Sequence, residues 1–203
     1  MARTPKIVED RREQILDAAL RVFAHKGFHR ATNKDIAREA GITAGLIYHY
    51  FDNKEAVLTS LVEERSPLGL LRSLPTEFFS LPPERFFRLL ITQILAFVES
   101  EQFTQIIRIF LPELIYSTEL ASLVASTFLQ ATAFPEKYIA ARVATGELRQ
   151  VDPTISAQIL ISCIVGMVLR RQILRDPVML SYSQEQLVEA IVSTACQSMF
   201  PLP

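Results

Sequence analysis

The side chains best suited to bind another molecule lie between Thr32 and Phe51. Thr32 and Thr43 each precede a run with helical periodicity, where a hydroxyl group and free backbone amides can hold a phosphate oxygen. Lys54 follows the second run and can pair with a nucleic-acid backbone. The predicted exposed face of that run carries side chains that can approach base edges in a major groove: Thr43, Ala44, Gly45, Tyr48 and His49. These residue types predict contact with DNA.

Such a surface needs its two helices held at a fixed angle. Asp35, three residues after Thr32, predicts a capped start for the first helix, and Gly41 predicts its end. Apolar side chains recur where two crossing helices touch: Ile36, Ala37, Ala40, Ile42, Ile47 and Phe51. A helix, a glycine turn and a second helix together have the layout of a helix-turn-helix. The alternative to a DNA-binding role is that the two helices only pack together, with the aromatic run 48–51 as part of the core.

At these residues the chain resembles the TetR family of regulators. It shares IAxxAG with a following hydrophobic residue, a Tyr-aromatic-Phe run and a lysine, flanked by ILDAALRVFAHKGF and FDNKEAVL. The resemblance covers about residues 10 to 60 and implies a homodimer that reads operator DNA. It implies base contact from Thr43, Ala44, Gly45 and His49, and phosphate contact from Thr32, Tyr48, Tyr50 and Lys54.

Ala44 and Gly45 depart from relatives that carry polar or bulky residues there. Because neither has a side-chain hydrogen bond to offer, we expect sparse direct readout, with more weight on thymine methyl contacts or DNA shape.

Helical periodicity extends along almost the whole chain, and no alternation long enough for a strand is seen. The fold class is therefore predicted to be all-α. Four prolines and one glycine between Ser66 and Pro83 predict repeated helix interruption, and Pro67 should end the fourth helix early. We expect a three-helix DNA-binding domain over residues 1–54, with its motif at 32–51, and a larger effector-binding and dimerisation domain over 55–203. The fourth helix, from 54, would connect them.

Phenylalanines are concentrated in the second predicted domain. They could line a pocket for a small apolar or aromatic effector, although core packing explains aromatic burial without a ligand. The candidates are Phe86, Phe87, Phe97, Phe103, Phe110, Phe128 and Phe134.

Two C-terminal helices, near 153–174 and 184–200, are rich in apolar residues. The family resemblance implies that they pair with their copies as a four-helix bundle, and packing within one chain is the alternative. The expected interface residues are Ile159, Leu160, Cys163, Ile164, Met167, Leu187, Ile191 and Ala195. Pro135 should kink or split the helix before them.

Several kinds of chemistry are disfavoured. No histidine follows residue 55, which removes Ser-His and Cys-His nucleophiles from the second domain. His25, His29 and His49 lie on different elements without a partner set for a metal, so neither metal nor cofactor is expected. We therefore expect that the protein is not an enzyme. The alternative is a small-molecule carrier or enzyme on a TetR-like helical scaffold.

Charge and hydropathy indicate where in the cell the protein is expected. Residues 1–54 carry a formal charge of +3 and the remainder of the chain carries −4. The N-terminal part is thus mildly basic and the rest is acidic. No signal peptide is evident, and Ile155–Leu169 is too short to cross about 30 Å of hydrocarbon, so a cytoplasmic protein without membrane contact is expected. The leading hypothesis is a repressor released from its operator by a small effector.

Overall fold

A computed structural model describes residues 5–196 and residue 199. Every regular element in the described part is helical, which confirms the all-α prediction. The chain forms two compact units. Unit 1 comprises Met1–Ser66 with Gln105–Val124, and unit 2 comprises Pro67–Thr104 with Ala125–Pro203. The functional division at residue 54 stays a prediction; the compact units follow a different boundary.

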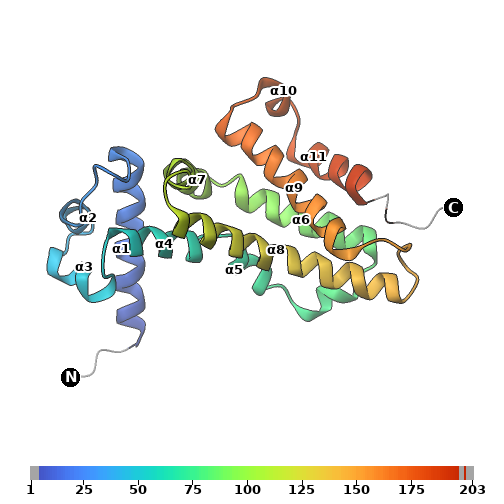
Figure 1. Ribbon diagram of the computed structural model, residues 1–203, viewed down its shortest axis with the longest axis horizontal. Helices are drawn as coiled ribbons and strands as arrows, with labels where there is room; N and C mark the ends of the chain where they lie inside the picture. The colour runs from blue at the N-terminus through green and yellow to red at the C-terminus, as the bar shows by residue number, and fades with distance from the viewer. Residues whose placement is uncertain (1–4, 197–198, 200–203) are drawn as a thin grey trace. The chain divides into compact units, whose positions relative to one another are not determined.

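Unit 1 begins with α1 (Pro5–Lys26), α2 (Asn33–Glu39), α3 (Ala44–Tyr50) and α4 (Lys54–Glu64). It also contains most of α7 (Glu101–Glu113) and the start of α8 (Thr118–Ala144). In Figure 1, α2 and α4 pack against α1, and α3 follows α2. The predicted helix-turn-helix is therefore present as α2 and α3.

The helix ends in unit 1 have local causes. Gly27 and Gly41 adopt φ values of +78° and +65°, the left-handed conformation that glycine accepts without a Cβ clash. Asn53 caps α4 by accepting from the Ala56 amide at 2.6 Å. α4 ends at Glu64, before Pro67, as predicted, because proline disfavours helical backbone at the residue before it.

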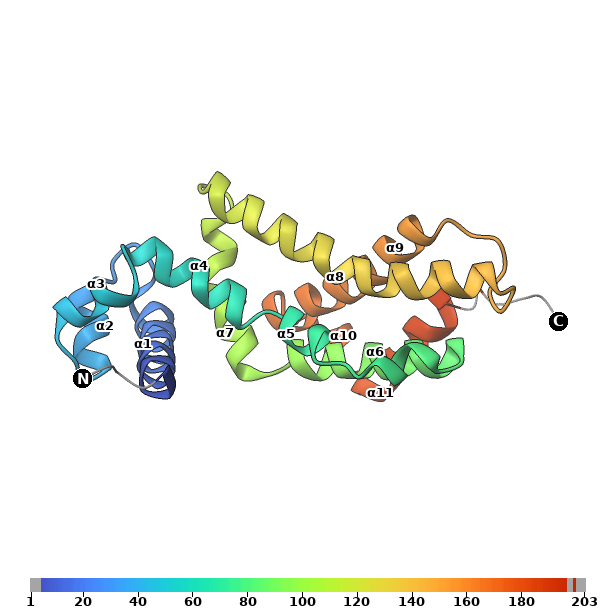
Figure 2. The same ribbon diagram turned by 90° about the horizontal axis from the view of Figure 1, so that it is seen from below.

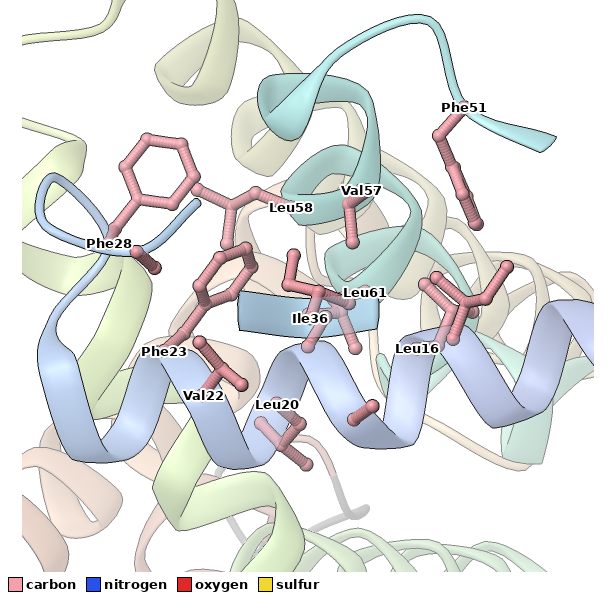
Figure 3. Close-up of a cluster of buried hydrophobic side chains, with 14 of the residues drawn as sticks. Leu16, Leu20, Val22, Phe23, Phe28, Ile36, Phe51, Val57, Leu58 and Leu61 are labelled. Atoms are coloured by element: carbon pink, nitrogen blue, oxygen red, sulfur yellow. The ribbon is translucent and has the colours of Figure 1, made fainter. Parts of the chain in front are cut away.

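One apolar core holds unit 1 together. Figure 3 shows Phe23 of α1, Phe28 of the following turn and Leu58 of α4 pointing toward one another, with Ile36 of α2 close by. The same cluster includes three buried residues from the later segment of the unit: Ile106, Ile109 and Leu120. Burying a large aliphatic side chain contributes about 1.5–3 kcal/mol. The core of unit 1 therefore draws on both segments of the chain.

Unit 2 contains α5 (Leu68–Arg72), a 3-10 helix η1 (Thr76–Ser80) and α6 (Pro83–Val98). After the rest of α8 come α9 (Pro153–Val168) with its π-helical extension η2 (Leu169–Ile173), then α10 (Pro177–Leu180). α11 (Gln184–Ile191) continues as the π-helix η3 (Val192–Cys196). Figure 2 shows α6 beside α11, and both also contact α9. The helix α8 is not split at Pro135.

The helix expected near 153–174 has nearly that length, so it is longer than its most apolar stretch, 155–169. Because η2 extends α9, the helix runs over Pro153–Ile173, 21 residues that include an 18-residue window with a mean hydropathy of 1.5. By length and composition it is the one helix in the described part that could cross a membrane. Its Leu160 and Ile164 side chains are buried within unit 2, as in an apolar helix that packs in a bundle.

Candidate DNA-binding interface

The outer face of α3 is exposed. Ile47 is fully buried and anchors the helix, while Tyr48 is 59% exposed. Thr43, Gly45 and His49 are also exposed. The structure therefore presents these four predicted contact residues on an accessible surface.

Ala44 and Tyr50 have a different placement. Both are half-buried and pack against the core of unit 1. The Tyr50 ring also meets the His49 ring edge-on, with centroids 5.3 Å apart. Tyr50 therefore supports the position of His49 in addition to any contact that it makes itself.

The two threonines at the helix starts differ in what their hydroxyl groups do. Thr32 Oγ accepts from the Asp35 amide at 3.2 Å and donates to Asp35 Oδ2 at 2.8 Å, and the capping box is complete. Thr43 makes no capping hydrogen bond through its side chain in the described structure. Its hydroxyl is the one available at the start of the recognition helix.

Asp35 is the polar centre between α1 and α2. Lys26 Nζ lies 2.6 Å from Asp35 Oδ1, and Arg38 lies 3.1 Å from the same oxygen. The hydrogen bond from Lys26, followed by those from Thr32, lowers the pKa of Asp35 to about 2. The carboxylate is therefore charged across the physiological pH range and holds the first helix of the motif to α1.

Lys54, predicted to contact phosphate, has its ammonium group against the protein. Nζ lies 2.8 Å from Phe28 O, 3.1 Å from Ala31 O and 3.4 Å from His29 O. It also lies 4.3 Å from the centroid of the Phe28 ring. Lys54, the first residue of α4, thus links this helix to the turn between α1 and α2.

The phenylalanines proposed for an effector pocket do not gather in one place. Phe86 and Phe87 are fully buried, and Phe86 stacks on Tyr138 with ring centroids 3.5 Å apart. Phe134 joins this cluster at 6.0 Å from Phe86. The remaining four are dispersed: Phe97 pairs with Phe103, Phe110 packs in unit 1, and Phe128 is 42% exposed. A role in effector binding stays a prediction for each.

Sequence reasoning missed Phe78, Phe79 and Tyr138, which complete the aromatic cluster. Tyr138 Oη donates to Leu81 O at 2.5 Å, which fastens α8 to the segment before α6. Phenylalanine spacing within one helix could not reveal a cluster built from η1, α6 and α8.

Half of the predicted dimer-interface residues face the interior of their own unit. Their exposed fractions are only 0–3%, so they have almost no surface to offer a second chain: Leu160, Ile164, Leu187 and Ile191. Ile159 is 52% exposed, and Cys163 and Met167 are half-buried. The side chain of Ala195 lies outside the described residues. The exposed apolar residues of the α9–η2 helix are Ile155, Ile159, Val165 and Leu169. The dimer interface stays a prediction.

No group of three His, Cys, Asp or Glu side chains in the described part could hold a metal ion. His25 and His29 are exposed. His29 Nε2 lies 3.0 Å from Oε2 of the buried Glu113 on α7, a pair that the sequence did not reveal.

Comparisons with known proteins match both parts of the chain. The family "Bacterial regulatory proteins, tetR family" matches residues 15–61. HbdR of Aromatoleum sp. (strain CIB), an HTH-type transcriptional regulator, is 48% identical over 54 residues, which span 27% of this chain and 24% of HbdR. The chain thus matches about a quarter of the length of that relative.

Solved structures share the fold over nearly the full length. SmeT, the repressor of the Stenotrophomonas maltophilia efflux pump SmeDEF, aligns with a TM-score of 0.74 and 26% identity, covering 94% of this chain and 90% of SmeT. FadR from Bacillus subtilis, solved with stearoyl-CoA, aligns with a TM-score of 0.72 and 21% identity, covering 92% of this chain and 98% of FadR.

The C-terminal part has its own family match. "AefR-like transcriptional repressor, C-terminal domain" matches residues 87–198, more than half of the 203 residues. With the tetR-family match over the helix-turn-helix, this assigns both parts of the chain consistently. The protein therefore belongs to the TetR family of bacterial transcriptional regulators.

Proposed function

We propose that the protein is a transcriptional repressor that binds operator DNA as a homodimer and leaves it on binding a small apolar or aromatic effector. The observation that carries the proposal is the exposed face of α3, fixed from behind by the buried Ile47 in a domain that matches the tetR family. Exposed residues at the start of a recognition helix are the ones that reach base edges.

The proposed base contacts are Thr43, Ala44, Gly45 and His49, with phosphate contacts from Thr32, Tyr48 and Tyr50. Thr43 and His49 supply the side-chain hydrogen bonds, because Ala44 and Gly45 offer none. Readout at the latter two positions rests on methyl contact and DNA shape.

Effector control requires a difference in affinity between two states of the protein. A ligand releases DNA only if it binds the DNA-free state more tightly than the DNA-bound state. The aromatic side chains of unit 2 favour an apolar or aromatic ligand. FadR was solved with stearoyl-CoA, whose stearoyl chain is apolar, and this supports an effector with an apolar part. Binding to chromosomal DNA would place the protein in the bacterial cytoplasm.

A titration of labelled DNA duplexes tests the proposal. The duplex from the promoter of the protein's own gene should bind about a thousand-fold more tightly than a scrambled duplex of equal composition, at matched salt. His49→Ala should change the sequence preference, whereas His25→Ala, at an exposed position outside α3, should not. Equal affinity for both duplexes across the salt series would refute sequence-specific regulation.

A further inference from the structure

Lys54 is the first residue of α4, and the sequence pattern gives it a positive charge beside the recognition helix. Its ammonium group has three N–H donors. Three backbone carbonyl oxygens lie within reach of them, at 2.8, 3.1 and 3.4 Å, all from the turn between α1 and α2. The donors of Lys54 are therefore matched by acceptors inside unit 1.

The Phe28 ring adds a second kind of contact. Its centroid lies 4.3 Å from Nζ, within the distance at which the face of an aromatic ring attracts a cation. The ring is itself buried, with 8% of Phe28 exposed, and meets Phe23 of α1 edge-on with centroids 5.2 Å apart. The ammonium group is thus held by groups that are part of the unit 1 core.

The turn at 28–31, which Lys54 contacts, sets the position at which the helix-turn-helix begins. The Ala31 amide donates to Gly27 O and Phe28 O, both at 3.2 Å, which closes the turn. Phe28 O and Ala31 O then accept from Lys54, and the next residue, Thr32, caps α2. A shift of this turn would move the start of α2, and α3 packs against α2.

We propose that Lys54 is a positioning residue of the DNA-binding unit and does not act as a phosphate ligand. It fastens the start of α4 to the turn at 28–31 and so sets the α2–α3 pair relative to α1 and α4. This inference deepens the proposed function and rests on it for its DNA-binding consequence, but its structural part can be tested without DNA.

Three variants of the full-length protein separate the two roles. Lys54→Met removes the charge and the three hydrogen bonds while keeping the apolar stem. Lys54→Arg keeps the charge but replaces the compact ammonium group with a planar fork that does not fit the three carbonyls. Lys34→Met is the control, because Lys34 is an exposed lysine of the same unit and its loss removes the same charge.

Thermal unfolding and the salt dependence of DNA affinity are the two measurements. A positioning role predicts that both Lys54 variants lower Tm by about 5 °C or more, while Lys34→Met leaves Tm unchanged. It also predicts that Lys54→Met weakens binding to all duplexes without changing the slope of log K against log salt.

A phosphate role predicts the opposite pattern. Tm would be unchanged in all three variants, Lys54→Arg would bind DNA normally, and Lys54→Met would reduce the slope by about 0.9. That pattern would overturn the inference. If the unmodified protein bound no DNA specifically, the proposed function would fail, and the Tm values alone would still decide whether Lys54 fastens the turn.

Discussion

At the scale of single residues, type and position did not determine which groups remain free to bind. Thr32 and Thr43 both precede a helix of the motif, yet Thr32 uses its hydroxyl in a capping box while Thr43 makes no such bond in the described structure. Lys54 has the charge for a phosphate contact, but three carbonyls surround its ammonium group. Whether a side-chain group is available for binding depends on its neighbours in space, and the spacing of residues along the sequence does not reveal them.

Asp35 gives a prediction at this scale. Its pKa is lowered from 3.8 to about 2, chiefly by Lys26, so its ionised form stabilises the folded state. That contribution is fully present above about pH 4 and is lost as pH falls toward 2. The Tm difference between the unmodified protein and Asp35→Asn should therefore shrink as pH falls through this window.

Lys26→Met serves as the matched variant for Asp35, because it removes the other partner of the same 2.6 Å contact. Its Tm difference should shrink over the same pH range. A difference that stayed constant between pH 5 and pH 2 in both variants would contradict the assignment of the low pKa to this pair.

At the scale of elements, the α9–η2 helix shows why helical periodicity alone could not separate buried apolar residues from exposed ones. The helix is apolar on more than one side, so its sequence does not distinguish the side facing its own unit from the side facing outward. Leu160 and Ile164 face inward, whereas Ile155 and Ile159 are more than half exposed. The exposed residues are the ones that could bury apolar surface against a second chain.

We expect Ile159→Glu to shift the proposed homodimer toward monomer, because a carboxylate in an apolar interface loses its hydration without gaining a partner. Sedimentation equilibrium measures this shift directly. Leu160→Ala, on the buried side of the same helix, is the variant for comparison. It should lower the free energy of unfolding by about 2–5 kcal/mol. A dimer of undiminished affinity in Ile159→Glu would place the interface elsewhere.

At the scale of the whole molecule, the unit that carries the helix-turn-helix is assembled from two separate segments. The chain passes between the units after Ser66, after Thr104 and after Val124. Ile106, Ile109 and Leu120 from the later segment share the core with α1 and α4. Glu113 adds a polar contact to His29, which lies in the turn at 28–31. A change in α7 therefore bears directly on the unit that contains the recognition helix.

Two isoleucines of this later segment provide a matched test. Ile109 is 8% exposed and Ile115 is 78% exposed. Ile109→Ala should destabilise the protein by about 2–5 kcal/mol and reduce hydrogen-exchange protection in α1 and α4. Ile115→Ala should change stability by no more than about 0.5 kcal/mol. Unchanged protection of α1 in Ile109→Ala would show that the N-terminal helices do not depend on α7.

The sequence by itself determined the all-helical class, the helix-turn-helix, its cap at Thr32, and the end of α4 before Pro67. These features depend on residues within a few positions of one another, so local spacing carries the information. The tertiary structure alone decided that Lys54 lies against carbonyls 23 to 26 residues earlier in the chain, that Phe86 stacks on Tyr138, and that Leu160 faces inward. Those outcomes depend on which distant segments pack together, and a helix with apolar residues on several sides is compatible with more than one packing.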